Sequence, residues 1–195
     1  MEQYAENLFL EKRAENPFYR TASYEICFRV KNINSSLFEL NDEAILALGS
    51  SEFGDKKAAL KAMTPGFQRK NDKWSVSKKI KFIENLFSGF KTNVYLFEIN
   101  TTEHSFSSGG EVFVLDGLQR ITAIIDFMMG KFEIFGGISY DQIKSPKIAG
   151  NTMLGIKLFT FKSISEACQF YIDINIGNTH SEDDIEKARR FLADH

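Results

Sequence analysis

The chain has 195 residues, 43% of them hydrophobic, and its 24 basic and 26 acidic side chains give a net charge of -2. A chain of this size can bury its own core, but the charge balance excludes proteins that coat nucleic acid by charge alone and leaves only local contacts with DNA. No stretch approaches the roughly 18 apolar residues of a membrane span, and the N-terminal residues lack the basic start and apolar run of a signal peptide.

The sequence pattern of the N-terminal third predicts short helices and strands. Residues 2–15 have the composition of a polar helix, and 24–30 alternate apolar and polar residues as a half-buried strand does. Residues 37–40 predict a short partner strand. Glycines interrupt the helical pattern of residues 42–63, so we expect two short helices there rather than one long helix.

The segment Thr64-Pro65-Gly66 predicts a turn that interrupts regular secondary structure. We take residues 1–63 as an extension of helices and a strand, packed on a core of residues 64–195 to form one globular unit. The expected elements are a helix from Ser75 or Ser77 to Gly89, strands at 94–99, 112–115 and 156–161, a helix ending near Met129, a helix from Ser163 or Ser165 to about Ile174, and a helix from Ser181.

Metal-binding patterns are missing from the sequence. Cys27 and Cys168 are far apart and neither has a CxxC companion, while the three histidines are scattered. We therefore expect reduced thiols in a cytosol and no zinc site.

One motif carries candidate chemistry, at residues 115–120 (Leu-Asp-Gly-Leu-Gln-Arg). Here a buried strand runs into a helix, so free backbone N–H groups and the positive end of the helix dipole meet and favour an anion. Gly117 leaves room for a phosphate, and Arg120 can grip its oxygens. Asp116 can hold a metal ion or orient a water that Gln119 positions.

The same residues also fit a purely structural interpretation. Asp116 is a good N-cap, and Gln119 three residues later completes a capping box. This interpretation leaves Arg120 unexplained, but on spacing alone we favour it.

Residues 116–120 (Asp-Gly-Leu-Gln-Arg) resemble the Asp-Gly-Gln-Gln-Arg motif of a family within the ParB/sulfiredoxin-like superfamily. That family includes the GmrS part of GmrSD-type modification-dependent restriction enzymes and the Ssp phosphorothioate-sensing NTPase. Phe67-Gln68-Arg69 followed by Trp74 resembles the family's upstream Tyr-Gln-Arg…Trp segment, and residues 170–179 resemble its Phe-x-x-Ile-Asn-x-Gly-x-Thr segment.

The resemblance implies a ParB-like nuclease/NTPase domain, an α/β (α+β) fold with a small mixed sheet flanked by helices. It also implies binding and hydrolysis of a nucleoside triphosphate with Mg²⁺, in the cytosol of a bacterium or of a phage-infected host. The implied catalytic residues are Asp116, Gln119 and Arg120, with Mg²⁺ on Asp116. The implied phosphate-binding residues are Gln68, Arg69, Gly117, Arg120, Asn175 and Thr179. Leu118 replaces the family's second Gln, which favours binding over hydrolysis.

Two alternatives stay open for a protein of DNA metabolism or phage–host restriction conflict. One is a nuclease or nickase, because the superfamily contains such enzymes and residues 56–81 are rich in lysine, although neither an HNH motif nor a paired-acid-plus-lysine arrangement is present. The other is a non-catalytic regulator that binds DNA or a protein partner. Candidate DNA contacts are Lys70, Lys73, Lys78 and Lys79, and a homodimer is a further candidate assembly.

Overall fold

A mixed four-stranded sheet forms the centre of the molecule. The computed structural model describes residues 22, 24–33, 37–48, 55–68, 73–99, 111–143, 152–176 and 182–194. The strands are β1 (Tyr24–Arg29), β2 (Asn93–Ile99), β3 (Val112–Asp116) and β4 (Met153–Phe161), in the spatial order β1-β4-β2-β3. The two central strands β4 and β2 run parallel, and each outer strand pairs antiparallel with its neighbour. The predicted α/β class with a mixed sheet is therefore confirmed.

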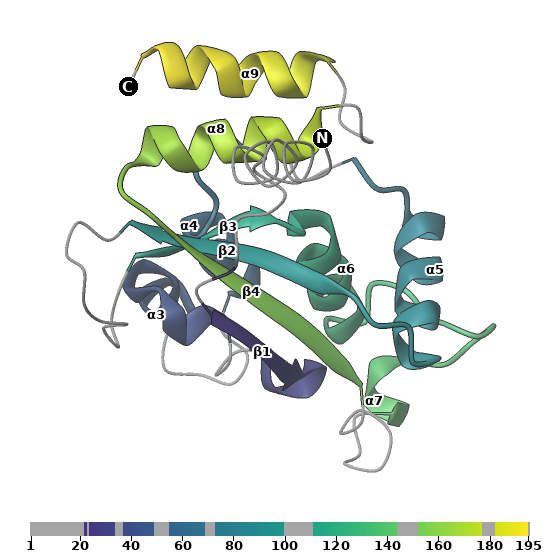
Figure 1. Ribbon diagram of the computed structural model, residues 1–195. Helices are drawn as coiled ribbons and strands as arrows, with labels where there is room; N and C mark the ends of the chain where they lie inside the picture. Colours follow the sequence, from purple (N-terminus) through teal and green to yellow (C-terminus); the bar gives the residue numbers. More distant parts are fainter. Residues whose placement is uncertain are drawn as a thin grey trace, which may run out of the picture.

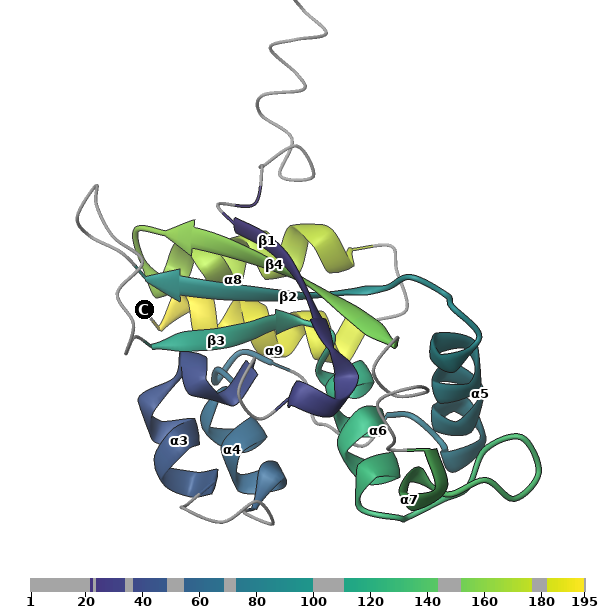
Figure 2. The same ribbon diagram turned by 90° about the horizontal axis from the view of Figure 1, so that it is seen from below.

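Helices cover both faces of this sheet (Figure 1). They are α3 (Asp42–Leu48), α4 (Lys56–Ala62), α5 (Val76–Phe87), α6 (Leu118–Met128), α7 (Tyr140–Ile143), α8 (Ile164–Asn175) and α9 (Glu182–Ala193). The layer of α8 and α9 lies on one face, and the other helices lie on the opposite side, with α3 and α4 beside the β3 edge and α5 beside α6 (Figure 2). No helix among the described residues is long and apolar enough to cross a membrane.

Alternation along the strands divides the apolar side chains between two cores. On β2, Val94 and Leu96 join the core under α3 to α7, whereas Tyr95 and Phe97 join the core under α8 and α9. A strand buried on both faces loses the apolar–polar alternation of a half-exposed strand, which explains the continuous apolar run in the sequence. The α8–α9 core is rich in phenylalanine, and its rings contact one another at centroid distances of 5.2–6.4 Å.

Local capping signals place the helix ends where the sequence predicts them. The hydroxyl of Ser75 accepts a hydrogen bond from the backbone N–H of Lys78 at the start of α5, and Ser163 accepts one from Glu166 at the start of α8. Gly89 follows α5 with a positive φ of 93°, which suits a glycine beyond a helix end. The two short helices expected within residues 42–63 are α3 and α4.

The strand predicted at residues 37–40 is wrong, since Phe38–Leu40 form a turn of 3-10 helix. Leu37 and Phe38 are fully buried, so their apolar pattern reflects contact with the core and not a place in the sheet. Asn41 then ends this turn, where its side chain accepts from the N–H of Ala44 and donates to the carbonyl of Val112. The helix predicted at residues 2–15 lies outside the described residues.

Candidate functional site

The turn from β3 into α6 is shaped by Gly117. This residue adopts a left-handed conformation with φ 100° and is the N-cap of α6, with no side-chain capping hydrogen bond. A Cβ at this position would lie 2.7 Å from Cγ1 of Val94, so glycine is required both by the backbone and by the close approach of β2. The predicted capping box of Asp116 and Gln119 is therefore wrong, because the left-handed residue moves the N-cap one position along the chain.

Asp116 and Arg120 form an ion pair across this turn. Nη2 of Arg120 lies 3.3 Å from Oδ2 of Asp116, and both side chains are partly exposed. Nη1 of Arg120 also donates to the carbonyl of Asn93, at the start of β2. The pair thus ties the head of α6 to the neighbouring strand.

Two buried glutamines connect the turn to the segment between α4 and α5. Nε2 of Gln68 donates to the carbonyls of Val114 and Leu115, at 3.1 and 2.6 Å. Oε1 of Gln119 accepts from the backbone N–H of Trp74 at 3.2 Å. The carbonyl of Met63 accepts from the N–H of Val114 at 2.8 Å, so this segment covers the outer edge of β3.

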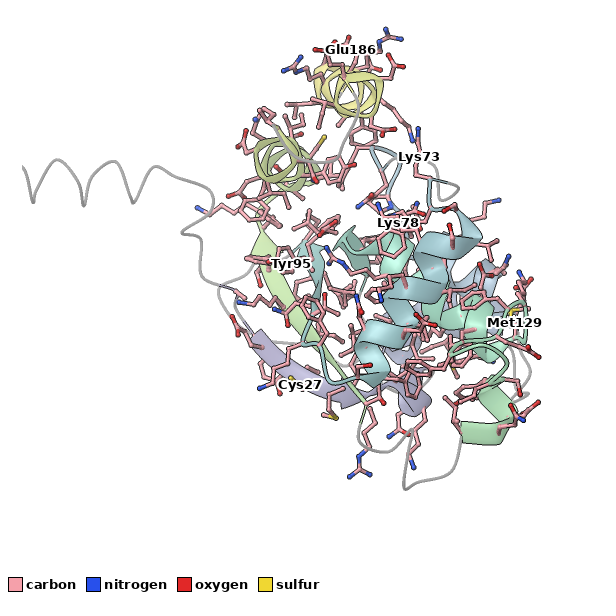
Figure 3. All side chains as sticks on the ribbon, turned by 90° about the vertical axis from the view of Figure 1, so that its right-hand side faces the viewer. Cys27, Lys73, Lys78, Tyr95, Met129 and Glu186 are labelled. Atoms are coloured by element: carbon pink, nitrogen blue, oxygen red, sulfur yellow. The ribbon has the colours of Figure 1, made fainter. Side chains whose placement is uncertain are left out.

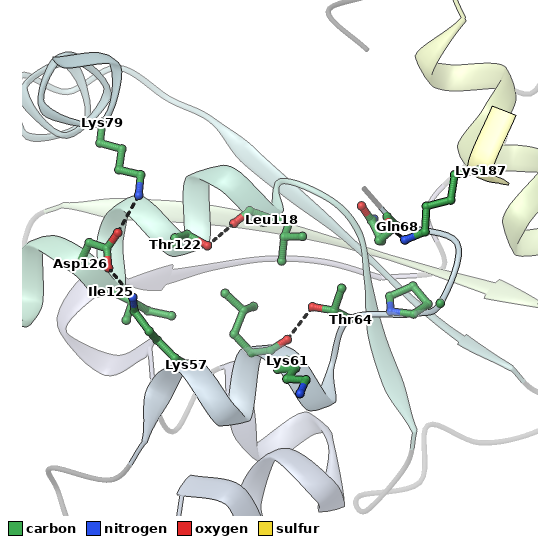
Figure 4. A pocket seen from close by; sticks show the side chains of 13 residues that line it. Lys57, Lys61, Thr64, Gln68, Lys79, Leu118, Thr122, Ile125, Asp126 and Lys187 are labelled. Atoms are coloured by element: carbon green, nitrogen blue, oxygen red, sulfur yellow. Dashed lines mark hydrogen bonds and ion pairs between the residues drawn. The ribbon is translucent and has the colours of Figure 1, made fainter. Parts of the chain in front are cut away.

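Beside the first turns of α6 lies a cavity of about 460 Å³, here called the lysine cavity (Figure 4). Its apolar wall includes Leu60 of α4 and Leu118 and Ile125 of α6. Four lysines line it from three helices: Lys57 and Lys61 from α4, Lys79 from α5 and Lys187 from α9. The volume and the mixture of apolar surface with a few converging charges are typical of a small-molecule site.

A buried carboxylate holds part of this lysine set in place. Asp126 is 5% exposed, and its oxygens lie 2.7 Å from Nζ of Lys79, 2.9 Å from Lys131 and 3.4 Å from Lys57. Burial alone would raise the pKa of Asp126, but the hydrogen bonds and charges of Lys79 and Lys131 outweigh it, and the pKa lies below its ordinary value. Asp126 is thus charged at neutral pH.

The structure brings only some of the sequence-predicted residues together. Gln68 lines the lysine cavity, but Asp116, Gly117, Gln119 and Arg120 do not. Arg120 is two positions after Leu118, so it lies about 200° round the helix from that residue. Arg69, Lys70 and Thr179 lie outside the described residues.

The other predicted residues have internal contacts. Nδ2 of Asn175 donates to the carbonyl of Tyr171 at 2.8 Å, and Asn175 lines a second hollow between α8 and α9. Lys73 extends toward α9 (Figure 3), where its Nζ lies 3.4 Å from Asp184. Nζ of Lys78 lies 4.9 Å from the centre of the Trp74 ring, and Lys79 pairs with Asp126. Each described candidate for DNA contact therefore has a partner within the chain.

Sequence reasoning counted Lys57 and Lys61 only as members of the lysine-rich window 56–81, and it missed Asp126 and Lys187 as parts of one cavity. Two signals were available. Lys57 and Lys61 are spaced i,i+4 and so share a face of α4. Thr122 and Asp126 interrupt the apolar residues of α6 at the same spacing, which is unusual for a helix buried almost all round.

Among the described residues, no group of three His, Cys, Asp or Glu side chains gathers. The turn at residues 116–120 contains one carboxylate, that of Asp116. One carboxylate is enough for a Mg²⁺ ion that arrives on phosphates and keeps most of its waters. Asp116 could bind such an ion only if its ion pair with Arg120 opened.

Comparison with models of known protein families shows the family to which the chain belongs. Residues 51–193 match the model of the family described as GmrSD restriction endonuclease, N-terminal domain. The chain belongs to this family. Membership relates it to restriction endonucleases and hence to DNA metabolism. Comparisons with curated proteins and with solved structures return no match.

Replacing Gly117 by alanine should destabilise the protein by about 2–4 kcal/mol, since the left-handed backbone and the contact with Val94 add their costs. Gly89 is the matched control, because its φ is 93° and nothing lies within 4 Å of the position of its Cβ. Gly89→Ala should therefore cost only about 1–2 kcal/mol. Urea denaturation measures both values, and equal losses would contradict the packing role of Gly117.

Asp126→Asn should lower the free energy of unfolding by about 1–3 kcal/mol at pH 7, because Lys79 and its neighbours lose a buried partner. Since the folded-state pKa of Asp126 is lowered, this contribution is present above the unfolded-state pKa of about 3.9 and is lost as the pH falls through the folded-state value. The difference between parent and variant should thus be constant from pH 5 to 7 and shrink below about pH 4.

The control for that experiment is Asp183→Asn, at an exposed position of α9. It should change stability by less than about 0.5 kcal/mol over the whole range. A pH-independent loss in Asp126→Asn would show that the carboxylate charge does not matter.

Proposed function

We propose that the chain binds a nucleoside triphosphate, with the phosphates in the lysine cavity, as its part in restriction-related DNA metabolism. The observation that carries the proposal is the convergence of lysines from three helices on one cavity beside α6. Lysine ammonium groups are common phosphate ligands because each is a compact charge with three donors.

Charge and shape both favour a phosphate-bearing ligand. Four lysines face one carboxylate in the lining of the cavity, which leaves three positive charges uncompensated there. A multiply charged anion would replace the mutual repulsion of the lysines by attraction. The apolar wall of Leu60, Leu118 and Ile125 offers burial to a sugar and a base.

The second hollow is a poor rival for the same ligand. Its described lining contains Glu182, Asp183 and Glu186 against the single cation of Arg189. Like charges would repel phosphates there. The lysine cavity is therefore the phosphate site in this proposal.

The residues that hydrolysis would need are held by contacts within the chain. Oε1 of Gln119 accepts from Trp74, and Arg120 is held by Asp116 and Asn93. Leu118, in place of the family's second Gln, presents an apolar side chain to the cavity. Turnover would require Arg120 to leave Asp116 for the phosphates and Asp116 to take a Mg²⁺ ion, which would supply charge neutralisation at the phosphate oxygens.

Binding is tested by thermal unfolding with ATP, GTP, CTP or UTP at 1 mM and Mg²⁺. At least one should raise the melting temperature of the parent by about 3–8 °C, because ligand binding to the folded state stabilises it. Lys61→Ala should weaken affinity at least roughly tenfold, whereas Lys81→Ala, an exposed lysine of α5 outside the cavity lining, should bind as the parent does.

Absence of any shift in the parent, or equal behaviour of the two lysine variants, would refute binding in this cavity. Phosphate release in the same mixtures measures turnover, and the Arg120→Ala variant should abolish any that occurs. Conversion of supercoiled plasmid to open circles with Mg²⁺ would instead support the nuclease alternative.

A further inference from the structure

The helix α9 is attached to the body by one apolar face. Ile185 and Ala188 are buried against α8, and the ring of Phe191 meets that of Phe67 edge-on at 5.5 Å between centroids. Sγ of Cys168 also donates to the carbonyl of Ala188 at 3.2 Å. A short helix held on one face opens at lower cost than the central strands.

Two polar contacts join this helix to the segment that lines the lysine cavity. Nζ of Lys187 donates to the backbone carbonyl of Gln68, and Figure 4 shows its side chain reaching from α9 toward that residue. The carboxylate of Asp184, one turn earlier, pairs with Lys73. The helix thus contacts both ends of the connection between Gln68 and Lys73.

Lys187 makes two kinds of contact: it lines the cavity, and it holds α9 to the backbone of Gln68. An ammonium group carries three donors, so it can keep the Gln68 carbonyl and donate to an anion at once. Both contacts exist only while α9 is docked. An anion in the cavity therefore binds the docked form more tightly than an open one, and by linkage it stabilises docking.

We infer that Lys187 is a ligand-binding residue that couples occupancy of the lysine cavity to docking of the C-terminal helix α9. This inference rests on the proposed binding of phosphates in that cavity. Ligand binding would then stabilise the docked position of α9, the helix that covers Phe67 and the phenylalanine-rich core.

Hydrogen exchange of the α9 amides, followed by mass spectrometry with and without inorganic tripolyphosphate or the best-binding nucleotide, tests the coupling. In the parent, saturating ligand should slow exchange in α9 about tenfold. Lys187→Ala should bind the ligand about tenfold more weakly and should show no slowing in α9 even at saturation. Lys187→Arg should restore part of both effects, because it keeps a charged donor.

Arg190→Ala is the matched control. Arg190 lies on the same helix, its side chain is 78% exposed, and its ion pair is with Glu186 of α9 itself. This variant removes the same charge and should behave as the parent does. Ligand binding to the parent without slower exchange in α9, or equal behaviour of the Lys187→Ala and Arg190→Ala variants, overturns the coupling alone. No binding of either ligand to the parent overturns the proposed function and the coupling together.

Discussion

The buried amide of Gln68 is the contact on which the site depends. Its two hydrogen bonds to Val114 and Leu115 fix the end of α4's connection against the last residues of β3. The same backbone segment gives Lys187 its acceptor and forms one wall of the lysine cavity. A buried amide that lost these acceptors would be left unsatisfied, so the segment has one strongly preferred position.

The two sides of α6 make different contacts. On one side, Arg120 and Asp116 tie its first turn to β2, and Gly117 allows the close approach of Val94. On the other side, Leu118, Thr122 and Asp126 face the cavity. Residues 116–120 therefore build the turn that orients the helix, while residues further along the helix and from its neighbours supply the charges.

Features fixed by local chemistry could be predicted from the sequence. The serine N-caps of α5 and α8 and the glycine after α5 depend on neighbouring residues alone. The strand β2 was predicted from its continuous apolar run, which burial on both faces of the sheet explains. Residues 37–40 were mistaken for a strand because burial by distant helices produces the same apolar pattern. The capping box failed because a glycine adopts positive and negative φ with similar ease, so the sequence alone does not fix the left-handed conformation of Gly117.

The site was predictable only in part, for a related reason. Gln68 and the 116–120 turn were found through their resemblance to a family motif, and they do lie together. The lysine cavity was not found, since its lysines at 57, 61, 79 and 187 come from helices far apart in the chain. In the sequence these residues look like ordinary solvated helix faces, and only the packing of α4, α5 and α9 around α6 gathers them.

The most direct test of this account is the ligand affinity of the variant Gln68→Met, which keeps the side-chain length but removes the amide. Circular dichroism and a cooperative melting transition verify that the variant is folded, and Gln169→Met, at an exposed position of α8, serves as the control. We predict that folded Gln68→Met binds nucleotide at least roughly tenfold more weakly than the parent, while Gln169→Met binds normally. A folded Gln68→Met variant with parental affinity would contradict the claim that this amide builds the site.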